Sequence, residues 1–235
     1  MTLKNKLNIT DEVKLAHEEE RMSKLAALAL YRDGTLDTLV PGTFSALKTI
    51  HVALFGDIYD FAGRIRTVNL AKGNFRFASA IYLESAIRSI ETMPQENFDQ
   101  IVEKYVEMNI AHPFREGNGR SGRIWLDHMF RRELDRTVDW SRIGREDYLL
   151  AMERSPVRDL EIKALLGQAL SDDLRSVALL ARSVDASYAY EGYRRLPGRR
   201  TWVSDGGPSG AVAVRVRGSR ATLLCRARTW SVGVI

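Results

Sequence analysis

The sequence has almost no cysteine and no long apolar run. Its single cysteine, Cys225, excludes an internal disulfide and agrees with a reducing compartment such as the cytoplasm. Nowhere do eighteen apolar residues follow one another, and the lysine-bearing residues 1–8 are not followed by an apolar segment. We therefore expect neither export nor membrane insertion, but a cytoplasmic protein whose 45% hydrophobic residues form a core.

Acidic residues are almost absent from the last part of the chain. Residues 192–235 carry nine arginines and one acid, Asp205, which gives +8, whereas the whole chain carries +5 and residues 1–191 therefore carry −3. The basic charge thus belongs to a tail, whose glycine-rich break at 206–210 predicts weak strands or a disordered arm. We do not expect a nucleic-acid partner, although a nucleic-acid-binding module that uses this tail is an alternative function.

What the sequence does contain is one run of chemically useful side chains. Residues 112–120 read His-Pro-Phe-Arg-Glu-Gly-Asn-Gly-Arg, and Arg123 follows three positions later. Proline disfavours the helical region for the residue before it, so we expect His112 in extended backbone just after an apolar helix. Histidine has an unperturbed pKa close to neutral pH, which suits a general base.

The second half of this run predicts an anion site. The Gly-Asn-Gly segment at 117–119 opens an amphipathic stretch, so the unsatisfied N–H groups of a helix start would face the loop and attract phosphate. Arg120 and Arg123 lie three apart, on one helix face, where their guanidinium groups can bind two phosphates. Glu116 adds a lone carboxylate, which beside phosphates indicates magnesium shared between protein and nucleotide.

These residues resemble the signature of the Fic family, H-P-F-x-[D/E]-G-N-G-R-x-x-R, at every specified position. The resemblance implies a protein adenylyltransferase that transfers AMP from ATP to a tyrosine, threonine or serine hydroxyl of a target protein, with release of pyrophosphate. It also implies that His112 is the general base and that Glu116 binds Mg2+. The implied nucleotide-binding residues are Glu116, Gly117, Asn118, Gly119, Arg120 and Arg123.

Other activities of the family remain open at this point. The kinase-like branch carries a lysine at the position of Gly119, so the glycine favours nucleotidyl transfer, but the motif excludes neither phosphocholine transfer nor removal of AMP. A non-enzymatic nucleotide sensor is an alternative from another class. By analogy with relatives, a type II topoisomerase subunit is a candidate target. Other relatives are bacterial toxins held by antitoxins. The resemblance also implies a homo-oligomer.

Helical periodicity predicts a mainly α fold with one β-hairpin, in agreement with the Fic fold that the motif implies. We expect a Fic domain over residues 1–195 and a basic tail, disordered or weakly structured, over 196–235. His51 lies near an apolar stripe and is interpreted as structural. Three expected helices have a predicted N-cap: 10–34 with Thr10, 43–56 with Thr43 and 80–93 with Ser79. In the third of these, Ile81 is expected on the same side as Ile87 and Ile90. The other expected helices are 96–111, 119–136, 145–154, 159–170, a run capped by residues 171–173 that ends near 184, and a short last element at 185–192.

Residues 64–77 alternate apolar and polar side chains around a Lys-Gly-Asn turn, a pattern typical of a β-hairpin. By resemblance to the family, this hairpin is a flap over the active site that binds the target segment along an exposed strand edge. An ordinary surface hairpin is the alternative. The flap residues are Lys72, Gly73, Asn74, Phe75, Arg76 and Phe77.

A second motif follows the expected catalytic core. The pattern Ser187-x-x-x-Glu191-Gly192 resembles the inhibitory motif [S/T]-x-x-x-E-[G/N] of the family. The resemblance implies that Glu191 pairs with Arg123 in place of the γ-phosphate of ATP, while Ser187 supports it. An exposed acid at a helix end is the alternative. Three nearby hydroxyls are candidate sites of self-modification that would release this element: Tyr188, Tyr190 and Tyr193.

Overall fold

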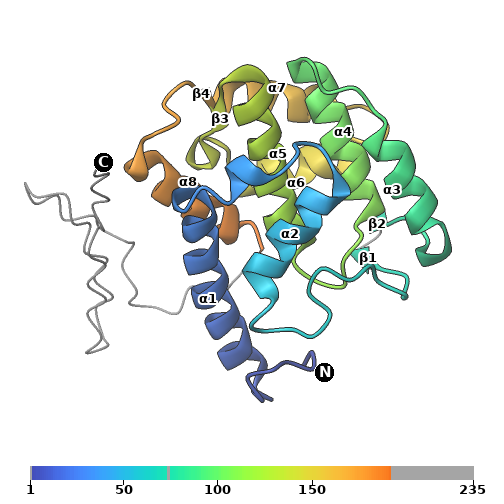
Figure 1. Cartoon of the computed structure of the whole chain (residues 1–235). Helices are drawn as coiled ribbons and strands as arrows, with labels where there is room; N and C mark the ends of the chain where they lie inside the picture. The colour runs from blue at the N-terminus through green and yellow to red at the C-terminus, as the bar shows by residue number, and fades with distance from the viewer. Residues whose placement is uncertain (1, 73–74, 192–235) are drawn as a thin grey trace, which may run out of the picture. The chain divides into compact units, whose positions relative to one another are not determined.

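The polypeptide folds around two helices, α4 (Phe98–Ala111) and α5 (Asn118–Leu134), which pack against each other (Figure 1). The structure, a computed structural model, describes residues 2–72 and 75–191, and these belong to one compact unit. Parts of the predicted flap, inhibitory segment and tail lie outside the described residues: Gly73, Asn74, Gly192, Tyr193 and residues 196–235.

The remaining helices surround this pair. Helix α2 packs on α1 and α5, α8 packs on α1 and α5, and α3 and α7 pack on α4 (Figure 1). The mainly helical architecture predicted from the sequence is confirmed, and within the described ranges no helix is both long and apolar enough to cross a bilayer. The bounds are α1 (Glu12–Arg32), α2 (Phe44–Phe55), α3 (Leu83–Glu91), α6 (Arg145–Arg154), α7 (Leu160–Ala169) and α8 (Val177–Ala189), with 3-10 turns η1 (Leu36–Thr38), η2 (Ala80–Tyr82) and η3 (Trp140–Arg142).

Helix α5 is enclosed by its neighbours, and its sequence explains why. Trp125, Leu126, Met129 and Phe130 are apolar on more than one face of the helix, and each is fully buried. A helix that is apolar on several sides is stable only inside a protein, where all of those sides are covered. The Trp125 indole N–H donates to Thr43 O at 3.0 Å, so its polar group is satisfied as well. The core therefore holds the first turn of α5 in a fixed place.

Capping residues set several helix starts. Thr43 caps α2 as predicted, because its side chain accepts a hydrogen bond from Ala46 N. The prediction of Thr10 as the cap of α1 is wrong by one residue, since Asp11 accepts from Lys14 N at 2.8 Å. Aspartate is the stronger cap, and its negative charge is favoured at a helix N-terminus.

The C-terminal part of the domain differs from the sequence prediction. Residues 171–173 do not cap a helix, because Leu170–Ser171 forms strand β4, which pairs antiparallel with β3 (Thr137–Val138). The cap is instead Ser176, whose hydroxyl accepts from Leu179 N. One helix, α8, continues from there to Ala189, so residues 185–191 of the predicted separate element are the last turns of α8 and the turn after it.

The segment before α3 also departs from its prediction. Ser79 makes no side-chain cap, and the chain first forms the 3-10 turn η2 before α3 begins at Leu83. A 3-10 turn has three residues per turn, which rotates its side chains off the face of the following α-helix. Ile81 is therefore 80% exposed, whereas Ile87 and Ile90 are buried as predicted. The N–H of Ala80 is satisfied by Asn69 Oδ1.

The predicted hairpin is present but short. Strands β1 (Ala71–Lys72) and β2 (Phe75–Arg76) pair antiparallel, with Ala71 opposite Arg76 and Lys72 opposite Phe75. The preceding residues 64–70 are irregular, contrary to the prediction of a hairpin from residue 64. Arg66 explains part of this difference, because its backbone N–H donates to Pro113 O in the loop after α4 instead of to a partner strand.

Candidate active site

His112 lies at the end of α4 and opens the loop that leads to α5. Its φ of 50° and ψ of 60° are left-handed, so the prediction of an extended backbone is wrong. Pro113 disfavours only the right-handed helical region for His112, and the left-handed region lets the His112 N–H bond Met108 O at 3.0 Å. The helix is thereby ended with its last N–H satisfied, and the imidazole leaves the helix axis.

The imidazole of His112 is held by two contacts. Nδ1 lies 3.2 Å from Asn109 O, and since a carbonyl only accepts, Nδ1 carries the proton and Nε2 keeps its lone pair. The ring of Phe77 stacks on the imidazole, with 3.6 Å between ring centroids and 18° between planes. Burial lowers the pKa of His112 to about 4, so the ring is neutral at pH 7. A neutral imidazole with a free Nε2 can accept a proton.

The loop after His112 is fixed from both sides. Phe114 is fully buried, and its N–H and C=O bond the side-chain amide of Asn118 at 2.8 and 2.7 Å. His51, interpreted from the sequence as structural, is buried and accepts from Gly63 N at Nδ1, so its Nε2–H donates to Glu116 O at 2.8 Å. The amide of Asn118 therefore serves the loop itself.

The start of α5 carries the residues predicted to form an anion site, and phosphate binding there stays a prediction. Gly117 is the N-cap with φ 79°, and a Cβ there would meet Phe55 Cε2 at 2.3 Å, so the close approach requires glycine. A glycine cap brings no side chain to satisfy the first N–H groups of the helix. These groups and the positive end of the helix dipole are the usual binding elements for phosphate.

Arg120 is buried and contacts two carboxylates. Its Nη1 lies 2.6 Å from Glu19 Oε1 on α1, and its Nη2 lies 3.2 Å from Glu116 Oε1. The Tyr59 hydroxyl also donates to Glu19. Glu19 was not predicted as a site residue, although its place in the buried stripe Leu15, Glu19, Ser23 and Ala27 of α1 marks it as an inward-facing acid.

Arg123 contacts α8 instead, so the two predicted arginines bind different helices. Its Nε donates to Ser187 Oγ at 2.7 Å, and its Nη2 donates to Ser187 O at 2.8 Å and to Glu191 Oε1 at 2.6 Å. Burial would raise the pKa of Glu191, but the charges of Arg123 and Arg120 outweigh this effect and lower it to about 2. A Cβ on Gly119 would lie 2.6 Å from Glu191 Oε1, so this glycine leaves room for the carboxylate.

The end of α8 is anchored by Tyr190. Its hydroxyl lies 2.9 Å from Trp140 O and 2.8 Å from Ile143 O, and its ring stacks on Tyr148 with 4.8 Å between centroids. Tyr188 and Tyr190 are each only 2% exposed. Their modification would need the end of α8 to detach, so self-modification stays a prediction for these two residues.

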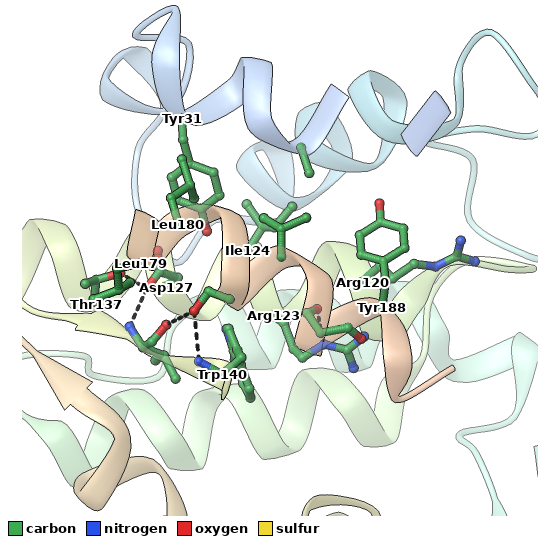
Figure 2. A pocket seen from close by; sticks show the side chains of 15 residues that line it. Tyr31, Arg120, Arg123, Ile124, Asp127, Thr137, Trp140, Leu179, Leu180 and Tyr188 are labelled. Carbon is green, nitrogen blue, oxygen red and sulfur yellow. Dashed lines mark hydrogen bonds between the residues drawn. The ribbon is translucent and has the colours of Figure 1, made fainter. Parts of the chain in front are cut away.

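A small cavity lies between α8, α1 and α5. Figure 2 shows it, with Arg123 and Tyr188 at one end and Asp127 and Thr137 at the other. Its volume of about 20 Å³ is enough for one water molecule. Ligand pockets measure roughly 300–1,000 Å³, so this cavity is not a nucleotide site.

Glu116 is the more exposed of the two predicted site carboxylates, with a side chain 43% exposed compared with 21% for Glu191. Both of its side-chain contacts, to Gly117 N and to Arg120 Nη2, use Oε1. Among the described residues no group of three or more histidines, cysteines or acids could hold a metal by itself. A single accessible carboxylate fits the predicted magnesium, for which nucleotide phosphates and water supply the other ligands.

The flap places one of its predicted residues on the catalytic loop. Phe77 touches both His112 and Phe75, with 5.1 Å between the two phenylalanine centroids. Lys72 and Arg76 are exposed on the two short strands. Their role in binding a target segment stays a prediction.

Comparison with known proteins identifies the family of this chain. The model of the Fic/DOC family matches residues 41–130. A probable protein adenylyltransferase, y4lH of Sinorhizobium fredii, is 32% identical over 170 residues, which cover 67% of this chain and 85% of that protein. The protein adenylyltransferase VbhT of Bartonella schoenbuchensis is 34% identical over 158 residues, and the matched part covers 61% of this chain but only 31% of VbhT.

Solved structures share the fold at lower identity. The N-terminal Fic domain of Bep8 from Bartonella sp. 1-1C superposes with a TM-score of 0.64 at 21% identity, covering 74% of this chain and 93% of that domain. BepC from Bartonella tribocorum, solved with bound AMPPNP, gives a TM-score of 0.60 at 20% identity, covering 73% of this chain and 93% of that one. These likenesses establish the predicted helical fold with its small hairpin.

Proposed function

Because this chain belongs to the Fic/DOC family, we propose that it is a protein adenylyltransferase that transfers AMP from ATP to a hydroxyl side chain of a target protein. The observation that carries the proposal is His112, a neutral imidazole with Nε2 as its acceptor, at the mouth of a loop that ends in the glycine-capped start of α5. This arrangement joins a general base to a phosphate-binding helix end within one short segment.

The reaction assigns a role to each part of the loop. Nε2 of His112 accepts the proton of the target hydroxyl while that oxygen attacks the α-phosphorus of ATP. The new bond joins the hydroxyl oxygen to phosphorus, the bond from the α-phosphorus to the bridging oxygen breaks, and pyrophosphate leaves with its electron pair. The N–H groups at 117–119 stabilise the negative charge on the transferring phosphate.

The acidic and basic side chains of the loop are proposed to neutralise the negative charge of the leaving pyrophosphate. Glu116 would hold Mg2+, which neutralises phosphate charge when bound. Arg123 is proposed to bind the γ-phosphate once Glu191 has left it. Arg120 has Nη1 bonded to Glu19, so it is proposed to reach phosphate through Nη2.

We further propose that Glu191 inhibits the enzyme by occupying Arg123. The pair is supported by its distance of 2.6 Å and by the Ser187 hydroxyl and carbonyl, which bond the same guanidinium. ATP can then bind only with its γ-phosphate away from Arg123. In that orientation the α-phosphorus is not placed for attack by a hydroxyl that His112 deprotonates.

Labelled ATP tests the proposal directly. Purified protein, Mg2+ and bacterial lysate are incubated with ATP labelled at the α-phosphate, and in a second reaction at the γ-phosphate. We expect α-label on a protein band with Glu191→Gly, no α-label when His112→Ala is added to it, and no γ-label in any reaction. His17→Ala is the matched control, because it also replaces a histidine but lies on α1, and it should keep the α-label. Label that persists without His112 would refute the mechanism, and the labelled band gives the size of the target.

A further inference from the structure

Arg66 is a buried cation that no part of the proposed chemistry uses. It lies in the irregular segment before the flap and is only 4% exposed. Its Nε donates to His112 O at 2.7 Å, Nη1 to Val68 O at 2.6 Å, and Nη2 to Ala78 O at 2.6 Å and to Ala111 O at 3.1 Å. All four acceptors are backbone carbonyls, and they belong to two separate segments.

The first segment is the C-terminal end of α4. Helix ends leave carbonyls without partners, and the helix dipole makes this end negative, so a guanidinium there is favourable even though burial removes it from water. Ala111 and His112 supply the two carbonyls, and the Arg66 N–H reaches on to Pro113 O at 2.8 Å. The side chain and backbone of one residue thus bond three consecutive residues at the start of the catalytic loop.

The second segment is the base of the flap. Val68 precedes β1 and Ala78 follows β2, so the other two carbonyls come from the two sides of the hairpin. The Ala78 N–H also donates to Ile110 O on α4, and Phe77 lies flat on the imidazole of His112. The start and end of the hairpin are therefore joined by direct contacts to the end of α4 and to His112.

We propose that Arg66 is a positioning residue that locks the flap to the catalytic loop, so that a target hydroxyl held by the flap meets Nε2 of His112 at a fixed distance. The inference rests on the proposed AMP transfer. No ion pair among the described residues gives the buried Arg66 a carboxylate partner. The proposal explains why an arginine is nevertheless present there. A five-donor planar guanidinium can bond four carbonyls in two segments, whereas a lysine ammonium has three donors at one point.

The charge of Arg66 also acts on the imidazole. Burial is the largest cause of the lowered His112 pKa, Glu191 acts in the opposite direction, and Arg66 and Lys72 lower it further. Removal of the Arg66 charge should therefore raise the pKa of His112, while Arg66→Lys keeps the charge and should leave it near its present value. This difference separates the effect of the Arg66 charge, which the titration reports, from the effect of its hydrogen bonds, which kcat reports.

The test uses the full chain with Glu191→Gly and adds Arg66→Met or Arg66→Lys. We expect kcat for AMP transfer to fall about 10- to 100-fold with Arg66→Met, because a displacement of about 1 Å at a reacting group has that effect. The KM for ATP should stay within about twofold, since the start of α5 is untouched. Arg66→Lys should give an intermediate kcat.

Lys104→Met is the matched control. Lys104 is also a buried cation bonded to backbone carbonyls at the end of a helix, here α3. Its Nζ lies 3.2 Å from Glu91 O and 3.1 Å from Met93 O, and none of its hydrogen bonds within the described residues goes to His112. We expect this variant to lower the melting temperature without changing the His112 titration. If it reproduces both the kcat and the titration change of Arg66→Met, Arg66 is only a structural cap.

The titration of His112, followed by NMR of 13C-labelled histidine, needs no AMP transfer and so separates this inference from the proposed function. An upward shift with Arg66→Met and none with Arg66→Lys supports the inference even in a chain that transfers nothing. If Arg66→Met does not fold, Arg66→Lys decides by its kcat alone. A folded Arg66→Lys with parental kcat, or a folded Arg66→Met with parental titration and kcat, overturns the inference.

Discussion

Arg123 Nη2 and Glu191 Oε1 lie 2.6 Å apart just after the end of α8, and within the described ranges the other hydrogen bonds of this guanidinium go to Ser187 of α8. The side chain of Arg123 is 3% exposed, so the pair is shielded from water on the arginine side. In the proposed mechanism, a γ-phosphate that binds Arg123 replaces Glu191. The predictions for Glu191→Gly and Tyr190→Phe depend on this proposed competition.

Glu191→Gly should raise the initial rate of AMP transfer. A hydrogen bond to a charged group is worth about 1.5–3 kcal/mol, so removal of the competitor should raise the rate roughly ten- to hundredfold. Quantified α-label on the target, compared with wild-type protein at equal concentration, measures the change. Equal rates for the two proteins would remove the case for inhibition by Glu191.

Tyr190→Phe should also raise the rate, but less. The change removes the hydroxyl that bonds Trp140 O or Ile143 O while it keeps the ring on Tyr148. A hydrogen bond of this kind is worth about 0.5–1.5 kcal/mol, which predicts a rate increase of about two- to tenfold. Tyr82→Phe, at an exposed hydroxyl, is the control and should leave the rate unchanged. A rate for Tyr190→Phe at or below wild type contradicts the anchoring role.

AMP transfer should persist at unusually acidic pH. His112 acts as a base only when neutral, and burial lowers its pKa to about 4. The neutral form therefore predominates above that value and is lost as the pH falls through it, whereas an ordinary histidine would lose it near pH 6.5. The pH profile of kcat/KM for Glu191→Gly, with circular dichroism at each pH as the control for folding, measures the midpoint. A midpoint at 6.5 or above is the contrary result.

Glu19→Gln should destabilise the domain. The change leaves Arg120, 1% exposed, without the acid that lies 2.6 Å away on α1. Breaking a buried ion pair by removal of one partner costs about 3–5 kcal/mol in the free energy of unfolding. Glu161→Gln, at an exposed pair with Arg154, should cost less than about 1 kcal/mol. Urea unfolding of both variants tests the contrast, and equal losses would show that the Arg120 pair has no special weight.

The features that were predicted correctly depend on residues that are close in sequence. The family was evident from the run at 112–123, because the base, the loop and the helix start are consecutive in it. The start of α2 followed from Thr43, since a cap bonds an N–H three residues away. Ser187 and Glu191 were named from a resemblance to a short motif, and their inhibitory role stays a prediction.

Three of the errors share one cause, which is competition between local signals. Thr10 and Asp11 both can cap a helix, as can residues 171–173 and Ser176, and the chain used the later residue each time. The backbone of His112 was predicted from Pro113 alone, but two conformations satisfy that proline. The hydrogen bond to Met108 O at the end of α4 decided between them.

Sequence alone thus determined which side chains the loop carries: a histidine, the glycine that caps a helix start and two arginines within twelve residues. Only the tertiary structure decided which groups hold them. Glu19 meets Arg120 across 101 residues, and Arg66 meets His112 across 46. Such pairs depend on how whole helices pack, so no local pattern of residues encodes them. Packing also set the neutral state of His112, because burial and not residue type lowers its pKa.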